Sequence, residues 1–358
     1  MESRSPDARD QSVDCARGLA IVAIVLGHVE RGLASASLMP YDTALTIDRL
    51  LYLFHLATFA YLSGLFVRRT VERDGALPTL RRRATLFVWL YLLWTVIQGS
   101  VRIAASSVAN TPVTVGDIAK VWIPEGQLWF LPWLIAVTAV AALTQLWRSQ
   151  ARAAVVLVLA GVLAMAVWGF DPLYAFTRGW ALLFPFLVGC VVTQQRHAAM
   201  ARHLGVVVPA AVVGTVVWLG IGLATGAATP TTGGGGRTLT AVALGILGCA
   251  AGVMATLAVA ALIARSPLAG VVALVGRRSL EIFLAHIVVA SGARIVLEQA
   301  GVSDTWVHLV AATALGVVVP IVIAVAADRL RWSWVFGLPA PLERLAGHAQ
   351  AASRRPGA

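Results

Sequence analysis

Long apolar runs, each of about twenty residues, recur along this chain and constrain its fold more than any other feature. Ala, Val, Leu and Ile fill these runs with few interruptions. A helix of this length matches the roughly 30 Å hydrocarbon core of a bilayer. Only 13% of the 358 residues are charged and the mean hydropathy is +0.81, which excludes a water-soluble globular protein. The sequence therefore predicts an all-α integral membrane protein.

The apolar runs give the expected domain organisation. We predict about ten transmembrane helices, at residues 17–37, 47–67, 84–103, 128–147, 152–170, 178–194, 204–224, 238–264, 271–293 and 304–327. They belong to one polytopic membrane domain, residues 1–330. The Arg-, Pro- and Ala-rich segment 331–358 is expected to be a disordered cytoplasmic tail.

The basic residues predict the orientation. With the N-terminus in the cytoplasm, 21 of the 28 Lys and Arg residues fall in inside segments. Only seven fall outside, at Arg31, Arg49, Arg102, Lys120, Arg178, Arg237 and Arg294. Lys and Arg favour the cytoplasmic side of a membrane. We therefore expect both termini in the cytoplasm and a multi-pass protein of the cell membrane.

Charge and cysteine content exclude two other kinds of partner. The net charge of +11 comes mostly from residues that flank apolar spans, so we expect contacts with membrane lipids rather than with nucleic acid. The cysteines are scattered and form no CxxC pair. We therefore expect neither a disulfide framework nor a metal site.

The first apolar run carries polar residues along a single helix face. Arg17 and His28 are eleven positions apart, which places them about 20° apart in projection, and Asp14 falls on the same stripe. His28 lies roughly 16 Å further along the axis than Arg17, near the middle of the bilayer. A polar side chain at that depth is costly to bury and usually functional. The alternative for His28 is a structural hydrogen bond between helices.

Two later spans repeat this pattern. His55 lies at the depth of His28, so the two can line one cavity, although a structural role is equally open. Ser279 and His286 are seven positions apart and share a helix face. Arg277 and Glu281 have the spacing of an i,i+4 ion pair.

Five arginines crowd one predicted inner loop and its borders: Arg68, Arg69, Arg81, Arg82 and Arg83. Anchoring by positive charge is one explanation. The other is a binding site for an anionic, phosphate-bearing ligand from the cytosol. Composition alone favours neither.

At this point the sequence resembles the acyltransferase 3 family of polytopic membrane O-acyltransferases. Arg17 and His28 match its Arg-x10-His motif, within the phrase Asp14–Cys15–Ala16–Arg17–Gly18–Leu19–Ala20. Other matching segments follow in order along the chain: Phe54–His55 with Ser63–Gly64, Arg81–Arg82–Arg83, Leu128–Trp129–Phe130–Leu131–Pro132, Phe184–Pro185–Phe186 with Gly189, and Gly276 through His286.

The resemblance implies transfer of an acyl group, commonly acetyl, from cytosolic acyl-CoA to a hydroxyl, often on a carbohydrate. It implies that His28 is the catalytic histidine with Arg17 as its motif partner. Arg81, Arg82 and Arg83 would contact the CoA phosphates, with Arg68 and Arg69 beside them. Asp14, His55, Ser279 and His286 are further candidates for catalytic or cavity-lining residues.

Several alternatives stay open from the sequence. A neutral His28 imidazole can act as a general base or can carry the acyl group itself. A transporter or flippase of a lipid-linked sugar would also place histidines and arginines in a membrane. A non-catalytic scaffold is a poor explanation for three histidines in apolar spans. The acceptor, the acyl chain length and the oligomeric state are not determined by these patterns.

Overall fold

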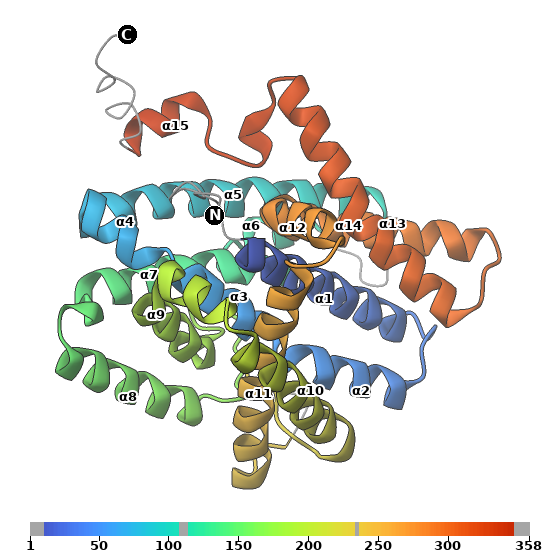
Figure 1. The fold of residues 1–358 in the computed structure, drawn as a ribbon. Coiled ribbons are helices and arrows are strands. Elements are labelled where there is room, and N and C mark those ends of the chain that lie inside the picture. Colours follow the sequence, from blue (N-terminus) through green and yellow to red (C-terminus); the bar gives the residue numbers. More distant parts are fainter. Residues whose placement is uncertain (1–10, 107–113, 233–235, 347–358) are drawn as a thin grey trace.

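The computed structural model describes residues 11–106, 114–232 and 236–346, which form a helical bundle (Figure 1). Both chain ends lie outside these residues, so the predicted location of the termini stays a prediction. Eight helical segments are long and apolar enough to cross a membrane. In the described part of the chain no strand is present. The prediction of an all-α membrane protein is confirmed.

The first half of the chain forms these helices: α1 (Gln11–Ser35), α2 (Tyr41–Tyr52), α3 (His55–Gly64), α4 (Val67–Asp74), α5 (Ala76–Ala104), α6 (Val115–Ala119), η1 (Gly126–Trp129), α7 (Phe130–Thr144), η2 (Leu146–Arg148) and α8 (Gln150–Ala166). The second half forms η3 (Trp180–Leu182), α9 (Leu183–Ala201), α10 (Leu204–Ala224), α11 (Leu239–Ile263), α12 (Ala269–Arg277), α13 (Ser279–Gln299), α14 (Thr305–Arg329), η4 (Ser333–Val335) and α15 (Ala340–Leu345).

Hydrogen-bonding caps explain where several helices begin. The side chains of Ser149, Thr238 and Asp304 accept hydrogen bonds from backbone amides three residues later. These bonds satisfy amides that have no partner inside the helix. Each capping residue directly precedes an apolar run, so the helix starts where the polar turn ends.

Helix α1 lies inside the bundle, between α5 on one side and α10 and α11 on the other (Figure 1). It packs against α2, α3, α11, α12, α13 and α14. A Cβ on Gly276 of α12 would overlap the carbonyl oxygen of Asp14, and Gly18 meets α12 equally closely. Small residues thus let the two backbones touch, as they do between helices in membranes. This contact fixes α1, and with it His28.

Two predicted spans are each split into two helices. The span predicted at 47–67 is broken at Leu53–Phe54, between α2 and α3. The span predicted at 271–293 is broken at Arg278, between α12 and α13. Hydropathy stays high across the first break and gives no signal for it, whereas Arg277 and Arg278 interrupt the apolar run at the second. The first break sets His55 at the start of α3.

Two other predicted spans, 152–170 and 178–194, correspond to α8 and α9. Helix α8 is apolar but has 17 residues, fewer than the other spans. Helix α9 is interrupted at Thr193, whose φ is +63°. Within the residues that the structure describes, eight rather than ten helical segments therefore meet the length and composition of a full span.

The segment after α14 packs against α5. The indole nitrogens of Trp89 and Trp94 donate hydrogen bonds of 2.9 Å to the carbonyls of Trp334 and Val335. The ring of Phe336 lies 5.5 Å from that of Trp94. Residues 331–346 of the expected tail are thus described as turns and short helices, and 347–358 lie outside the described residues.

Candidate active site

A polar cavity of about 260 Å³ lies near the end of the bundle where α1 stops. We call it the His28 cavity. Its walls come from α1, α2, α3, η1, α7 and α13 and from the segments before η3 and after α10. Polar and aromatic side chains dominate its lining, at His28, Arg31, Tyr52, His55, Gln127, Trp129, Arg178, Thr231 and Thr232.

His28 is half-buried and lies between two cavities. One is the His28 cavity and the other is a space of about 60 Å³ that also touches Ser291 and Arg294. Its ring centroid is 5.2 Å from that of His286 on α13. His28 therefore faces the protein interior, where a bound molecule can reach it.

Backbone contacts define the tautomers of the other two histidines. Nδ1 of His55 lies 2.6 Å from the carbonyl oxygen of Leu51, and Nδ1 of His286 lies 2.9 Å from those of Ile282 and Phe283. A carbonyl only accepts, so we assign the proton of each ring to Nδ1. Nε2 of each ring is then a lone-pair acceptor. Nε2 of His286 is buried and has no hydrogen-bond partner among the described residues.

The break between α2 and α3 explains how His55 is held. The Leu51 carbonyl accepts a hydrogen bond from the amide of Phe54 (3.1 Å) as well as from His55. The imidazole thus replaces a helical backbone partner at the break. The ring of Tyr52 packs edge-on against His55, with centroids 4.5 Å apart. The tight turn therefore fixes the direction of the ring.

Two guanidinium groups lie on the walls of the His28 cavity. Arg31 donates to Asp48 (2.6 Å) and stacks over the Tyr52 ring at 3.8 Å. Arg178 donates to Asp171 (2.6 Å) and lies 5.4 Å from the centroid of Trp129. Each carboxylate uses only part of the guanidinium fork, so donors remain for a ligand.

Two further side chains in the wall each have a buried oxygen without a hydrogen-bond partner among the described residues. The amide of Gln127 donates to the carbonyl of Phe283 at 3.0 Å, but its buried Oε1 accepts no hydrogen bond from the described residues. The buried hydroxyl of Thr231 is in the same situation. Buried polar atoms are rarely left unpaired in a folded protein. These groups fit a cavity that holds a polar ligand or water.

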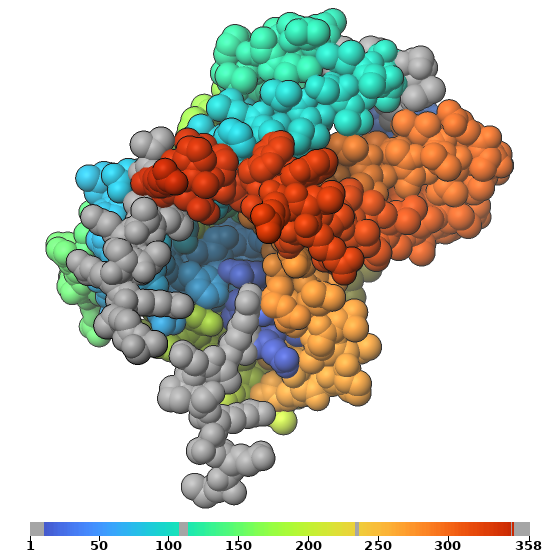
Figure 2. Space-filling model, turned by 90° about the horizontal axis from the view of Figure 1, so that it is seen from above, coloured from blue at the N-terminus to red at the C-terminus, as the bar shows by residue number. Residues whose placement is uncertain are grey.

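The opposite end of α1 carries a second set of charges. The Arg17 guanidinium lies 4.8 Å over the ring of Phe66, and Arg277 lies 3.9 Å from the buried carboxylate of Asp14. Arg83 donates to Thr138 at 3.1 Å and is close enough to Arg17 for their charges to interact. Figure 2 shows a hollow here, bordered by the start of α1 (dark blue), α4 (light blue), α12 (orange) and η4–α15 (red).

The comparison with protein families now decides the class of this protein. The model of the acyltransferase 3 family, described as an acyltransferase domain, matches residues 10–325. This chain belongs to the acyltransferase 3 family. Neither the curated proteins nor the solved structures gave a match.

Family membership establishes the general activity. The protein is a membrane acyltransferase, with an acyl donor and an acceptor substrate, and it is surrounded by membrane lipids. The resemblance read from the motifs is thereby confirmed. The roles of single residues, the identity of the donor and the nature of the acceptor are not given by the match.

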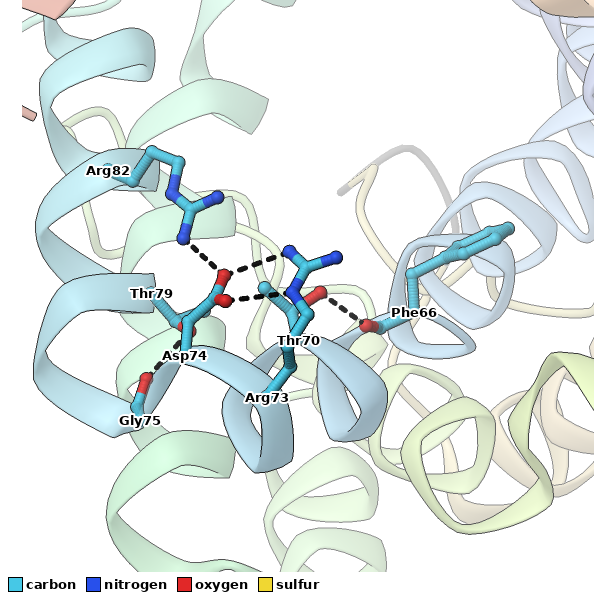
Figure 3. A network of polar contacts seen from close by, with 7 residues as sticks. All are labelled: Phe66, Thr70, Arg73, Asp74, Gly75, Thr79 and Arg82. Atoms are coloured by element: carbon cyan, nitrogen blue, oxygen red, sulfur yellow. Dashed lines mark hydrogen bonds and ion pairs between the residues drawn. The ribbon is translucent and has the colours of Figure 1, made fainter. Parts of the chain in front are cut away.

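The arginines predicted as one acyltransferase binding group point in different directions. Arg68 pairs with Glu72 (2.8 Å), and Arg69 and Arg81 are exposed. Asp74 accepts hydrogen bonds from both Arg73 and Arg82 (Figure 3). Of these arginines, Arg83 reaches the interior near Arg17. Consecutive helical residues differ by 100° in direction, so the side chains of the run 81–83 leave α5 in different directions.

Ser279 lies away from the His28 cavity. It begins α13, two turns before His286, and it lines neither cavity that touches His28. The predicted pair of Arg277 and Glu281 is wrong: Glu281 accepts from Arg278 (2.9 Å) because the chain breaks at that residue. This hydrogen bond raises the pKa of the Arg278 guanidinium.

Several cavity residues were not singled out from the sequence. Arg31 and Arg178 counted only as outside charges, Trp129 was named only as part of a family-like segment, and Gln127 was not named as a candidate. Tyr52 was not considered. A weak signal was available for Arg31, since it follows His28 by three positions and so shares its helix face. Arg178 comes from a connecting segment far from the others in the chain, where no periodicity applies.

The glycines in the family-like motifs serve packing. A Cβ on Gly64 of α3 would overlap the carbonyl oxygen of Phe186, and one on Gly189 of α9 would overlap that of Tyr61. Helices α3 and α9 therefore cross with their backbones in contact. This arrangement places α3, which carries His55, against the interior of the acyltransferase.

Proposed function

We propose that this acyltransferase moves an acyl group, most simply acetyl, from cytosolic acyl-CoA to a hydroxyl of a carbohydrate-containing acceptor at the cell membrane. The observation that carries the proposal is the His28 cavity. It places two imidazoles and two guanidiniums around about 260 Å³ of space inside an otherwise apolar bundle.

The donor is assigned to the end of the bundle where α1 begins. Arg17 and Arg83 are near enough there for their charges to interact, and Figure 2 shows that the start of α1 borders a hollow. Guanidinium groups are suited to phosphate because they donate in a planar fork. The excess of basic residues in predicted inside segments supports the assignment of this end to the cytosol. Arg82 contributes charge nearby, although Asp74 already pairs with it.

The thioester must travel along α1 to reach His28. Neither cavity that touches His28 is lined by Arg17 or Arg83, and roughly 16 Å of helix separates Arg17 from His28. Ile24 lies one turn from His28 on the Arg17 side and lines the cavity. We propose that the thin pantetheine arm enters by displacing this apolar side chain.

The chemistry then follows from groups in the cavity. A neutral imidazole of His28 takes the proton from the acceptor hydroxyl as its oxygen attacks the thioester carbonyl. The guanidiniums of Arg31 and Arg178 stabilise the negative oxygen of the tetrahedral intermediate. Collapse breaks the carbon–sulfur bond, and the imidazolium returns the proton to the leaving CoA sulfur. The products are the acyl ester and free CoA.

A carbohydrate acceptor is consistent with the wall of the cavity. The ring of Trp129 offers an apolar face, while Gln127, Thr231 and Thr232 offer hydrogen-bonding groups. Binding sites for small polar molecules combine these two kinds of surface. His55 presents Nε2 as an acceptor and is assigned to orienting a hydroxyl.

The test is acyl transfer from labelled acetyl-CoA in membranes that contain the protein. His28→Ala should abolish transfer while the protein stays in the membrane at normal abundance, because the variant loses its base but keeps its apolar span. His203→Ala is the matched control, since His203 is exposed and lies between α9 and α10. Undiminished transfer by His28→Ala would remove the catalytic assignment.

The same assay separates the two roles of His28. Without acceptor, a general base leaves the protein unlabelled, whereas an acyl carrier retains label on His28. We expect no retained label. Label that survives gel filtration and maps to His28 would show that His28 carries the acyl group instead of acting as a general base.

A further inference from the structure

A second cavity in the bundle is apolar and separate from the His28 cavity. Its volume is about 590 Å³, within the range of about 300–1,000 Å³ that small-molecule sites occupy. We call it the lateral cavity. Its walls come from α3, α8, α9, α10 and α11, with residues such as Ala57, Ala164, Phe184, Ala210, Ala250 and Met254. Tyr61 and His197 are among its few polar residues.

The lateral cavity is bordered by helix faces that meet lipid. Val158, Leu159 and Val162 of α8 are exposed, as are Val212 and Val216 of α10. In a bilayer such apolar faces are covered by hydrocarbon chains. The cavity extends from Ile246 to Ala261 on α11, about 22 Å at 1.5 Å per residue. A single lipid chain fits this length and this chemistry.

The lateral cavity and the His28 cavity share a wall along α3. His55 and Leu56 line the His28 cavity, and the next residue, Ala57, lines the lateral cavity. Two helix positions therefore separate an imidazole in a polar space from the apolar space behind it.

Two connecting segments form the same boundary. Thr231 and Thr232 line the His28 cavity, whereas Pro230 lines the lateral cavity. Arg178 belongs to the first cavity and Leu182, one turn later, to the second. Three elements from distant parts of the chain thus place a polar and an apolar space next to each other.

We propose that the acceptor is a lipid: its hydrocarbon chain lies in the lateral cavity and its hydroxyl-bearing head group lies in the His28 cavity. This inference rests on the proposed function and names the class of its acceptor. The head-group hydroxyl loses its proton to His28, its oxygen bonds to the acyl carbon, and the CoA sulfur leaves. An amphiphile satisfies both spaces at once, which neither a free sugar nor a polymer segment does.

The test follows label from radiolabelled acetyl-CoA in membranes of the producing cells. We expect the labelled product to partition into chloroform–methanol, as a lipid does, and to lose its label on mild base as an ester does. Ala250 lines the lateral cavity and is exposed, so Ala250→Trp fills the space without an internal clash. We expect this variant to lower transfer at least about tenfold, because the chain loses its binding surface.

A matched control comes from the same helix. Ala243 is also exposed but does not line the lateral cavity, so Ala243→Trp should transfer as the wild type does. Ala210→Trp fills the cavity from α10 and replaces Ala250→Trp if that variant is missing from the membrane. Equal transfer by the cavity variants and the control would overturn the proposal.

The other outcomes separate this proposal from the function beneath it. Label found only in water-soluble or polymeric product would overturn the lipid acceptor and leave acyl transfer standing. Transfer from labelled palmitoyl-CoA but none from acetyl-CoA would assign the lateral cavity to the acyl chain of the donor. This result would also overturn the lipid acceptor. No label in any product would overturn the proposed function and this inference with it.

Discussion

The two ends of α1 differ in how the protein surrounds their polar residues. At the end that carries His28 and Arg31, polar groups enclose a cavity and several of their hydrogen-bonding atoms are unused. At the end that carries Arg17, the charges border a hollow open to the surface, and Asp14 and Asp74 already balance part of them.

This difference indicates that the two ends of α1 have different functions, catalysis at the His28 end and donor binding at the Arg17 end. Charge that develops inside the protein during a reaction is felt more strongly than in bulk water, because the effective dielectric constant is lower there. Charges beside an open hollow are screened by solvent and act mainly in binding. Substitutions at the His28 end should therefore lower kcat, and those at the Arg17 end should raise KM for the donor.

The largest effect is expected for Arg178→Gln. This substitution removes one guanidinium from the His28 cavity. Removal of one hydrogen-bond donor of this kind lowers kcat by about 10²–10³-fold. KM for acyl-CoA should stay within about twofold, since Arg178 is far from the start of α1 along the bundle. Steady-state kinetics on the purified enzyme measure both. Asp171→Asn, which keeps the guanidinium, is the control, and a change in KM alone would reverse the assignment of this end.

A smaller effect is expected for Arg83→Gln. Losing one charged hydrogen bond to a phosphate should raise KM for acyl-CoA by about 10–100-fold and leave kcat nearly unchanged. Titration calorimetry with CoA gives the same quantity without turnover. Arg152, which is exposed near the α7–α8 connection, offers a control in Arg152→Gln. Normal donor affinity in Arg83→Gln would remove this residue from the donor site.

His286 should act as a positioning residue, with a still smaller effect. Its Nε2 has no hydrogen-bond partner in the described part of the chain and its ring lies 5.2 Å from that of His28, so it can accept a hydrogen bond from the His28 ring once substrate is bound. His286→Leu should lower kcat by about 3–10-fold and shift the pH profile of kcat. His286→Gln, which keeps an acceptor, should recover part of the rate. Equal loss in both variants with an unchanged pH profile would indicate a packing role.

The smallest effect is expected for Arg81→Gln. Arg81 is exposed and belongs to the same run as Arg83 but points elsewhere on α5. KM for acyl-CoA should change by about twofold or less, and the change should vanish in high salt because exposed charges are screened. A loss as large as that of Arg83→Gln would show that the run binds the donor as a unit.

Much of the fold was predictable from hydropathy, because a bilayer fixes the length and composition of its helices. The break at Phe54 was not. There the imidazole of His55 contacts the Leu51 carbonyl, a local side-chain contact that leaves no mark on a hydropathy profile.

The candidate site was predictable where polar residues interrupt apolar runs. His28 and His55 stood out for that reason, and the structure places both in one cavity. The pairing of His28 with His286 joins α1 to α13, a contact between helices that no local pattern contains. The direction of each arginine was also hidden, since composition counts charges and not the way they point.

The central claim is that a thioester bound at the Arg17 end reaches His28. A structure of the protein with a non-hydrolysable thioether analogue of acetyl-CoA tests it most directly. The account predicts that the nucleotide lies beside Arg17 and Arg83. It also predicts that the acetyl carbonyl carbon lies about 3–4 Å from the imidazole of His28 or from a hydroxyl bound to that imidazole. An acetyl group that stays at the Arg17 end, with Ile24 undisturbed, would contradict it.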